Sequence, residues 1–188
     1  MSSGETKSDL DEAFDNLKNA VITNLDYKHQ RLFREWLNLF SGYLAREKSF
    51  DPIKETLKYE PGTIVAIELG YNPGSEHGGN HYAVVVEDNA KTSPVVMIVP
   101  LGSMKPGKQV HFNDVDLGEI PEINRLSRYP QGTKTIAVVS QMRAISKMRI
   151  NAPVKSGDQI ITVSVPKLRD LYAKIRNRYT TKGLNKKE

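Results

Sequence analysis

Residues 74–86, GSEHGGNHYAVVV, join a glycine-rich polar loop directly to an apolar run. Glycine accepts positive φ angles and lets a ligand approach the backbone amides closely. The apolar run predicts a buried strand, and a loop held by such a strand is a frequent place for chemistry. We therefore expect Glu76, Asn80 and His81 to point toward a common site. The alternative interpretation is a tight turn between strands with histidines on the surface.

The sequence on both sides of this loop predicts a β-rich domain. Val, Ile and Tyr gather in short runs separated by Pro, Gly, Asn and Asp, which is typical of strands and turns. The polar segment 113–132 is expected to be a long loop, and a helix is expected from a cap at Ser164 to about Tyr179. The predicted strands are 63–69, 81–88, 94–101, 108–112 and 134–141, with a short one at 143–145 or 159–163.

The N-terminal part of the chain has helical rather than strand periodicity. Apolar residues recur on one face in 8–26 and form a wide stripe in 27–47. We expect two helices that need a surface to pack against, either the following domain or another copy. Asp51-Pro52 indicates a linker, so residues 1–57 are predicted to be a helical extension and residues 58–188 the main domain.

Composition limits the possible classes of protein. The 188 residues contain no cysteine, which excludes disulfides and thiolate metal sites, and no apolar stretch approaches the ~20 residues of a membrane span. We expect a cytoplasmic protein that does not bind a membrane. The net charge of +5 comes mostly from residues 162–188, which hold eight Lys and Arg against two Asp and Glu. Such a region attracts RNA backbone or an acidic partner, or is simply a solvated helix face.

Three blocks in this order resemble the MazF/PemK (Kid-like) toxins of bacterial toxin–antitoxin pairs. The first is GTIVAIEL at 62–69 with the loop and strand of 74–86, the second is SPVVMIVPLGS at 93–103, and the third is IAVVSQMRAISKMRI at 136–150. They are similar to the family's strand and G-[SH]-E loop, its S-P-x-hydrophobic-V-P-[IV]-T-S strand, and its Q-x-R-T-I-D-K run. The resemblance covers roughly residues 61–180.

The resemblance implies both a fold and a function. The expected fold is α+β: an SH3-like antiparallel β-barrel with a C-terminal helix, here preceded by an α-helical hairpin. The implied activity is metal-independent endoribonuclease cleavage of single-stranded RNA, leaving a 2′,3′-cyclic phosphate and a 5′-hydroxyl. The implied partners are single-stranded RNA, a cognate antitoxin and a second copy in a homodimer.

The chain departs from the family at several positions that the resemblance places in the site. His81 stands at the family's arginine and Tyr82 at the adjacent proline. Gly102 replaces the threonine that ends the V-P strand, and Ser140 replaces an acidic residue. Histidine can exchange a proton near neutral pH whereas arginine only stabilises charge, so His81 could take over proton transfer.

Candidate site residues follow from these matches. The catalytic candidates are His81, Ser103, Glu76 and Arg143. In this assignment Arg143 holds phosphate, Ser103 donates a hydrogen bond, and Glu76 is a base or positions the loop. The residues expected to bind RNA are Ser75, His77, Asn80, Lys105, Gln141 and Arg149. No metal or cofactor is expected, because His77 and His81 lie in a Gly-Gly loop with no evident third ligand.

Two other functions remain open at this stage. A protein with the same fold could bind RNA or an antitoxin without cutting, as the altered site positions suggest. A CcdB-like protein that targets gyrase shares the fold, but the loop at 74–79 resembles the ribonuclease branch instead. His81 and Ser103 distinguish an enzyme from a binding module, because an enzyme should need these two side chains.

Overall fold

The chain divides into two compact units, Met1–Ala45 and Arg46–Glu188. The computed structural model describes residues 7–104 and 107–180. The expected start of the main domain at residue 58 stays a prediction about which segment folds on its own.

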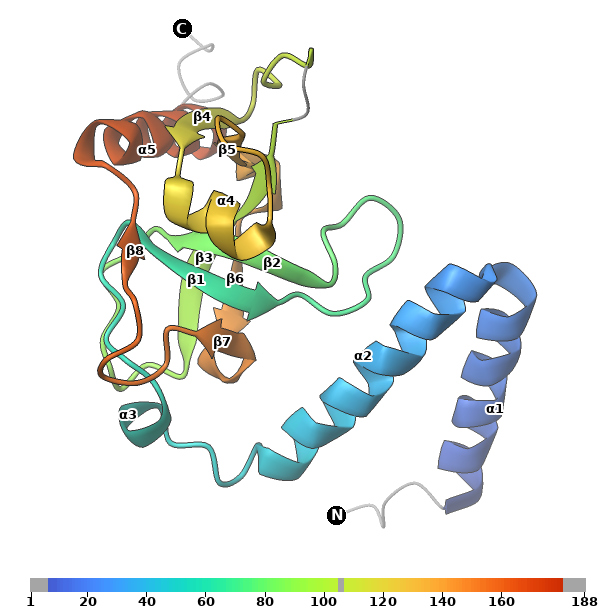
Figure 1. The fold of residues 1–188 in the computed structure, drawn as a ribbon. Helices are drawn as coiled ribbons and strands as arrows, with labels where there is room; N and C mark the ends of the chain where they lie inside the picture. Colours follow the sequence, from blue (N-terminus) through green and yellow to red (C-terminus); the bar gives the residue numbers. More distant parts are fainter. Residues whose placement is uncertain (1–6, 105–106, 181–188) are drawn as a thin grey trace, which may run out of the picture. The chain divides into compact units, whose positions relative to one another are not determined.

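The first unit consists of the helices α1 (Lys7–Asn24) and α2 (Tyr27–Arg46) (Figure 1). The joint between them is held by Gln30, whose side-chain amide donates to the Leu25 carbonyl at 2.7 Å. Neither helix buries a single residue over its described length, although both carry the predicted apolar faces. Among the described residues, no helix has the length and apolar character needed to span a membrane.

The second unit is built on an eight-stranded antiparallel sheet with the order β4-β5-β3-β2-β1-β7; in addition, β6 pairs with β3 and β8 with β1. The long strand β3 pairs through Val95–Ile98 with β6 and through Leu101–Ser103 with β5, so it joins two parts of a curved sheet. The strands are β1 Thr63–Glu68, β2 Asn80–Val85, β3 Val95–Ser103, β4 Val115–Glu119, β5 Lys134–Ala137, β6 Arg143–Ser146, β7 Ile150–Ala152 and β8 Ile161–Thr162.

Short helices and one long helix complete the second unit (Figure 1). The C-terminal helix α5 (Val165–Tyr179) packs against β4 and buries Leu171 in the core. The helical elements are α3 Pro52–Glu55, α4 Pro121–Ser127, α5 Val165–Tyr179 and the 3₁₀ turns η1 Val139–Gln141 and η2 Lys147–Arg149. The predicted α+β fold class is confirmed, with two N-terminal helices, an antiparallel sheet and a C-terminal helix; the eight strands form an open sheet where a closed SH3-like barrel was expected.

Alternation along the strands produces a core on each side of the sheet. Ile64 belongs to the cluster that includes Leu171, while the next residue, Val65, belongs to the cluster that includes Tyr59 and Ile98. Successive side chains of a strand point to opposite faces, so strands that are apolar at every position require cover on both sides. The site loop therefore leaves from strands that are fixed on both faces.

The secondary-structure prediction is wrong in the segment 108–132 and at 139–141, where the expected strand 134–141 has ended and the 3₁₀ turn η1 follows. No strand forms at 108–112, and the expected loop at 113–132 contains both β4 and α4. Val115 is buried in the core, whereas Phe112 is 76% exposed, so the strand forms where its side chains can be buried. The buried Asn124 of α4 donates to the Thr133 carbonyl at 3.0 Å and holds the following turn. The two alternatives for the short strand both exist, as β6 and β8.

Candidate active site

The loop between β1 and β2 is closed at its base by backbone hydrogen bonds. The Leu69 amide donates to the Gly79 carbonyl at 2.8 Å, and the Gly79 amide donates to the Gly70 carbonyl at 2.6 Å. Gly79 has a φ of +75°, and a Cβ on Gly78 would lie 2.6 Å from the Gly70 carbonyl oxygen. The glycines of the motif are therefore needed for the left-handed backbone and for this close approach.

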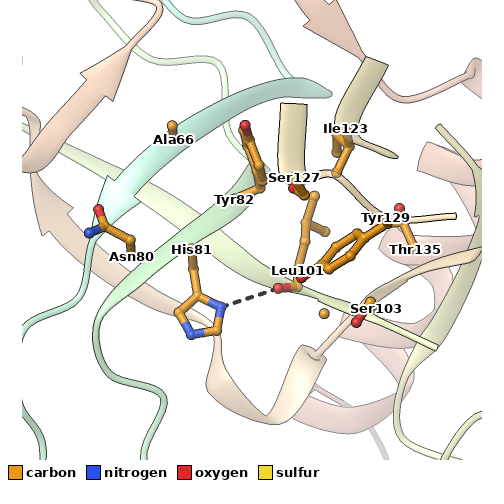
Figure 2. Close-up of a pocket in the computed structure, with 11 residues that line it drawn as sticks. Ala66, Asn80, His81, Tyr82, Leu101, Ser103, Ile123, Ser127, Tyr129 and Thr135 are labelled. Atoms are coloured by element: carbon orange, nitrogen blue, oxygen red, sulfur yellow. Dashed lines mark hydrogen bonds between the residues drawn. The ribbon is translucent and has the colours of Figure 1, made fainter. Parts of the chain in front are cut away.

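Two histidine rings meet where the loop joins β2. The rings of His77 and His81 stack with centroids 5.1 Å apart and planes inclined by 13°. His81 Nδ1 lies 3.4 Å from the Leu101 carbonyl oxygen of β3, as the dashed line in Figure 2 shows. His77 Nδ1 is buried and has no hydrogen-bond partner within the described part of the chain. The pair places two groups capable of proton transfer side by side.

The surroundings of His77 favour its neutral form. Burial lowers the pKa of the His77 imidazole, and the nearby His81 and Arg143 lower it further, while Asp114 acts in the opposite direction. Desolvation and neighbouring positive charge both disfavour an imidazolium. At neutral pH His77 therefore keeps a lone pair free to accept a proton.

Gln141, at the end of η1, connects the loop to the strand that carries Arg143. Its Oε1 accepts from the His77 amide at 3.1 Å and from Arg143 Nη2 at 2.7 Å. Its Nε2 donates to the Ser75 carbonyl at 3.2 Å. One side-chain amide thus holds both the histidine loop and the guanidinium. It brings together the predicted site residues Ser75, His77 and Arg143, whose roles stay predictions.

Arg143 supplies the positive charge of the site. Besides its bond to Gln141, its Nη1 lies 3.8 Å from Glu76 Oε2. The carboxylate side chain is 57% exposed and the guanidinium side chain 25%, so this is a loose ion pair at the surface. A phosphate could displace Glu76 and take its place on the guanidinium, since Arg binds phosphate through a planar fork of donors.

A pocket of about 420 Å³ opens beside His81 (Figure 2). Asn80, His81 and Ser103, all predicted site residues, line one part of it. Tyr82, one of the positions where the chain departs from the family, also lines it, whereas the sequence analysis missed the remaining polar lining: Ser127, Tyr129 and Thr135. The Ile120-Pro121-Glu122 sequence, with proline and an acid in a first helical turn, is the signal that could have revealed α4 and hence this wall.

Tyr129 is held firmly at the edge of this pocket. Arg128 adopts a left-handed conformation with a φ of 56°, which turns the chain at the end of α4. The Tyr129 amide then donates to the Asn124 carbonyl at 2.8 Å. Tyr129 is 44% exposed, so its aromatic ring is accessible at the pocket that His81 also lines.

Other predicted RNA-binding residues lie at the end of β1 or outside the described residues. Arg149 Nε donates to the Glu68 carbonyl at 2.8 Å, and Asn80 Oδ1 accepts from Asn151 at 3.3 Å. Lys105 lies outside the residues that the structure describes. In the described part of the chain, no three His, Asp or Glu side chains are grouped so that they could hold a metal ion.

The positions that differ from the toxin pattern are all near this pocket or the Gln141 turn. Tyr82 and Gly102 line the pocket, and Ser140 is an exposed residue of η1. A Cβ on Gly102 would meet the Ile136 side chain at 3.5 Å, which is ordinary van der Waals contact. Space for a side chain therefore exists at Gly102, and packing does not require glycine there.

The fold and this site together define an antiparallel sheet domain with a glycine-rich loop between β1 and β2 and a C-terminal helix. Comparison with protein families gives a match over residues 60–177 to the PemK-like, MazF-like toxin of type II toxin–antitoxin systems. The chain belongs to this family, as the three sequence blocks predicted. No individual curated protein gives a significant match to the sequence.

Proposed function

We propose that this protein is a metal-independent endoribonuclease that cleaves single-stranded RNA. The observation that supports this most is the stacked pair of His77 and His81 next to Arg143. Cleavage through the 2′-hydroxyl needs a base, an acid and positive charge near the phosphate, and these three side chains can supply all three.

In the proposed reaction the two imidazoles divide the proton transfers. Neutral His77 accepts the proton of the 2′-hydroxyl as the 2′-oxygen forms its bond to phosphorus. Protonated His81 donates to the 5′-oxygen as the bond from phosphorus to that oxygen breaks. The products are a 2′,3′-cyclic phosphate and a 5′-hydroxyl, and one proton is accepted for each one given. Arg143 stabilises the added negative charge on the phosphorane oxygens.

The other predicted residues then have supporting roles. Ser103 donates a hydrogen bond in the pocket beside His81, and Glu76 holds Arg143 until phosphate replaces it. Gln141 positions both Arg143 and the loop through the bonds described above. The residues proposed to contact the RNA chain are Ser75, Asn80, Lys105, Gln141 and Arg149.

Membership in a type II toxin family implies an antitoxin protein as partner and typically a dimer. For this chain we further propose that the basic C-terminal helix attracts the RNA backbone. Lys167, Arg169, Arg176 and Arg178 give α5 a positive charge. Binding through phosphate contacts of this kind weakens steeply as salt is raised.

A second candidate is a member of this fold that binds RNA or an antitoxin without cutting. It is supported by Gly102 and Ser140, where the toxin pattern has a threonine and an acid. Loss of those groups removes donors and charge that a catalytic site uses. This candidate and the enzyme make opposite predictions for the histidine variants.

The test is cleavage of a long single-stranded RNA in EDTA by the full-length protein, comparing wild type with His81→Ala and His77→Ala. We expect discrete wild-type cuts that each variant reduces by about 10²–10⁴-fold, the usual contribution of a general acid or base. End-group analysis should find cyclic phosphate. His111→Ala is the matched control, because this exposed histidine lies in the segment before β4.

Two results would contradict the proposal. Cutting that survives both histidine variants would contradict the two-histidine mechanism and assign the chemistry to other groups, such as Ser103, Arg143 or Glu76. No cutting by folded wild type, together with RNA binding that His81→Ala leaves unchanged, would favour the binding module.

A further inference from the structure

The pocket beside His81 lies where two paired strands separate. The strands β2 and β3 pair as far as Ala83 and Pro100, beyond which β3 pairs with β5 through residues 101–103. The cavity of about 420 Å³ is lined by residues 80–82 of β2 and 101–103 of β3, so it occupies the gap between the diverging strands. The path of the backbone therefore forms this pocket, and no ligand is needed to open it.

The lining of this pocket suits a neutral ligand. Apart from His81, the described side chains that line it include no Lys, Arg, Asp or Glu. Leu101 and Ile123 supply apolar surface, and hydroxyl groups supply hydrogen-bond donors and acceptors. An ionised ligand would lose its hydration here with at most one opposite charge to replace it. A nucleobase fits this lining better, because it is neutral and has apolar faces and a polar edge.

Thr135 is a buried polar side chain of this pocket. The residue is only 4% exposed, and it lies directly opposite Ser103 in the pairing of β5 with β3. Both side chains line the pocket, and no hydrogen bond joins either hydroxyl to another described residue. Buried hydroxyl groups nearly always have a hydrogen-bond partner, so this pair indicates that the pocket receives a polar group from outside the chain.

Tyr129 supplies a fixed aromatic surface at the same pocket. Its amide is held by the Asn124 carbonyl at 2.8 Å, while its side chain stays accessible. In Figure 2, Tyr129, Ser103 and Thr135 gather on one side of the pocket. An aromatic ring held in place is a stacking platform for RNA, because every nucleobase has a flat face that can stack on it.

We propose that this pocket is a nucleobase subsite. A base next to the cleaved bond stacks on Tyr129, and its edge exchanges hydrogen bonds with the hydroxyls of Thr135 and Ser127. The pocket is within reach of such a base, because His81 both lines it and stacks on His77. The inference rests on the proposed RNA-cleaving function, and it names what that site recognises besides phosphate.

Binding of RNA that cannot be cut tests the subsite apart from the chemistry. The probes are fluorescein-labelled ten-mers of U, of A and of C with 2′-fluoro riboses, which lack the attacking hydroxyl. Fluorescence anisotropy measures the Kd of each probe for the full-length protein. We expect Tyr129→Ala to raise the Kd of the best-bound ten-mer about fivefold or more, because a stacked base is lost. Tyr129→Phe should stay within about twofold of wild type, since stacking needs only the ring.

Two controls separate stacking from general effects on the protein. Tyr27→Ala removes a tyrosine of the helical unit that is 84% exposed, and it should leave every Kd unchanged. An abasic phosphate chain of the same length should bind wild type and Tyr129→Ala equally, because it has charge but no base. Equal Kd values of the ten-mers for wild type and Tyr129→Ala would overturn the proposal, and so would a loss that the abasic chain shows as well.

Thr135→Val tests the hydrogen bonds to the edge of the base. Valine replaces the hydroxyl by a methyl group on a strand, where valine is favoured. We expect the ratio of Kd between the worst- and best-bound ten-mers to shrink about threefold or more, because a hydrogen bond to the preferred base is lost. Ser127→Ala, at a half-buried position of α4, repeats the test without changing the core. An unchanged ratio in both variants would overturn the assignment of these hydroxyls to the base.

The outcomes distinguish the subsite from the cleavage reaction. Binding that depends on Tyr129, by a wild type that does not cut RNA, would keep the subsite and contradict the enzyme. Discrete cuts whose flanking bases are the same in Tyr129→Ala would keep the enzyme and overturn the subsite. Folded wild type that binds none of the ten-mers would also overturn the subsite, and would leave the pocket to a different ligand, such as a side chain of a protein partner.

Discussion

The two units of this protein differ in where their apolar side chains lie. In the sheet unit Ile98 and Val65 are fully buried, whereas in the helical unit Phe14 is 62% exposed and no residue of α1 or α2 is buried. The sheet unit thus has a core of its own, whereas the helical unit has apolar faces whose side chains are not buried. An apolar pattern in a sequence therefore predicts burial but does not say whether the cover comes from the same chain.

The largest expected effect is the difference in free energy of unfolding between a substitution in the sheet unit and one in the helical unit. Ile98→Ala should lower the free energy of unfolding by about 2–5 kcal/mol, because it leaves a cavity among buried side chains. Ile22→Ala in α1, where the side chain is 59% exposed, should change it by less than about 0.5 kcal/mol. Urea denaturation followed by circular dichroism measures both. Similar losses for the two variants would show that the helical unit is buried as deeply as the sheet.

A pair of glycines gives effects of opposite sign. Gly78→Ala should destabilise the sheet unit by about 1–3 kcal/mol, because its Cβ would lie 2.6 Å from the Gly70 carbonyl oxygen. Gly42, inside α2, has open space around it, so Gly42→Ala should stabilise that helix by about 0.5–1 kcal/mol. Thermal unfolding and far-UV circular dichroism report the two changes. A neutral Gly78→Ala would mean that the loop base is not as tight as described.

The smallest expected effect is a pH dependence confined to the site. Burial lowers the pKa of His77 below its ordinary value of 6.5, so as pH falls below that value the unfolded chain takes up a proton more readily than the folded one. Stability from neutral His77 is complete above pH 6.5 and is lost as pH falls toward the lowered pKa. His77→Gln should flatten this part of the stability curve, measured by urea denaturation at a series of pH values. An unchanged slope would contradict it.

The sequence predicts the elements of the fold where a strong apolar pattern exists. The strands β1, β2 and β3 and the helix α5 follow from continuous or periodic apolar runs. The segment 108–132 is mispredicted because its order depends on contacts between residues that are not neighbours in the sequence: Glu119 accepts from the Gly132 amide, 13 residues away, at 2.6 Å. Local composition, rich in polar residues, does not indicate that contact.

The candidate site was also predictable only in part, because its geometry depends on contacts between residues far apart in the sequence. The histidines, Gln141 and Arg143 could be named from motifs, and the structure brings them together. Their geometry could not, because Gln141 is 64 residues from the His77 amide that it accepts from. The wall formed by Ser127 and Tyr129 was missed because it belongs to the mispredicted segment.

The three hydrogen bonds of the Gln141 side chain have a consequence for how an anion at Arg143 affects the glycine loop. The same Oε1 accepts from the His77 amide and from Arg143, one on each lone pair, so each hydrogen bond weakens the other. An anion that draws the guanidinium away leaves the His77 amide as the sole donor to that oxygen, and the amide should then exchange its hydrogen with solvent more slowly. Binding of an anion to Arg143 should therefore make the glycine loop more rigid.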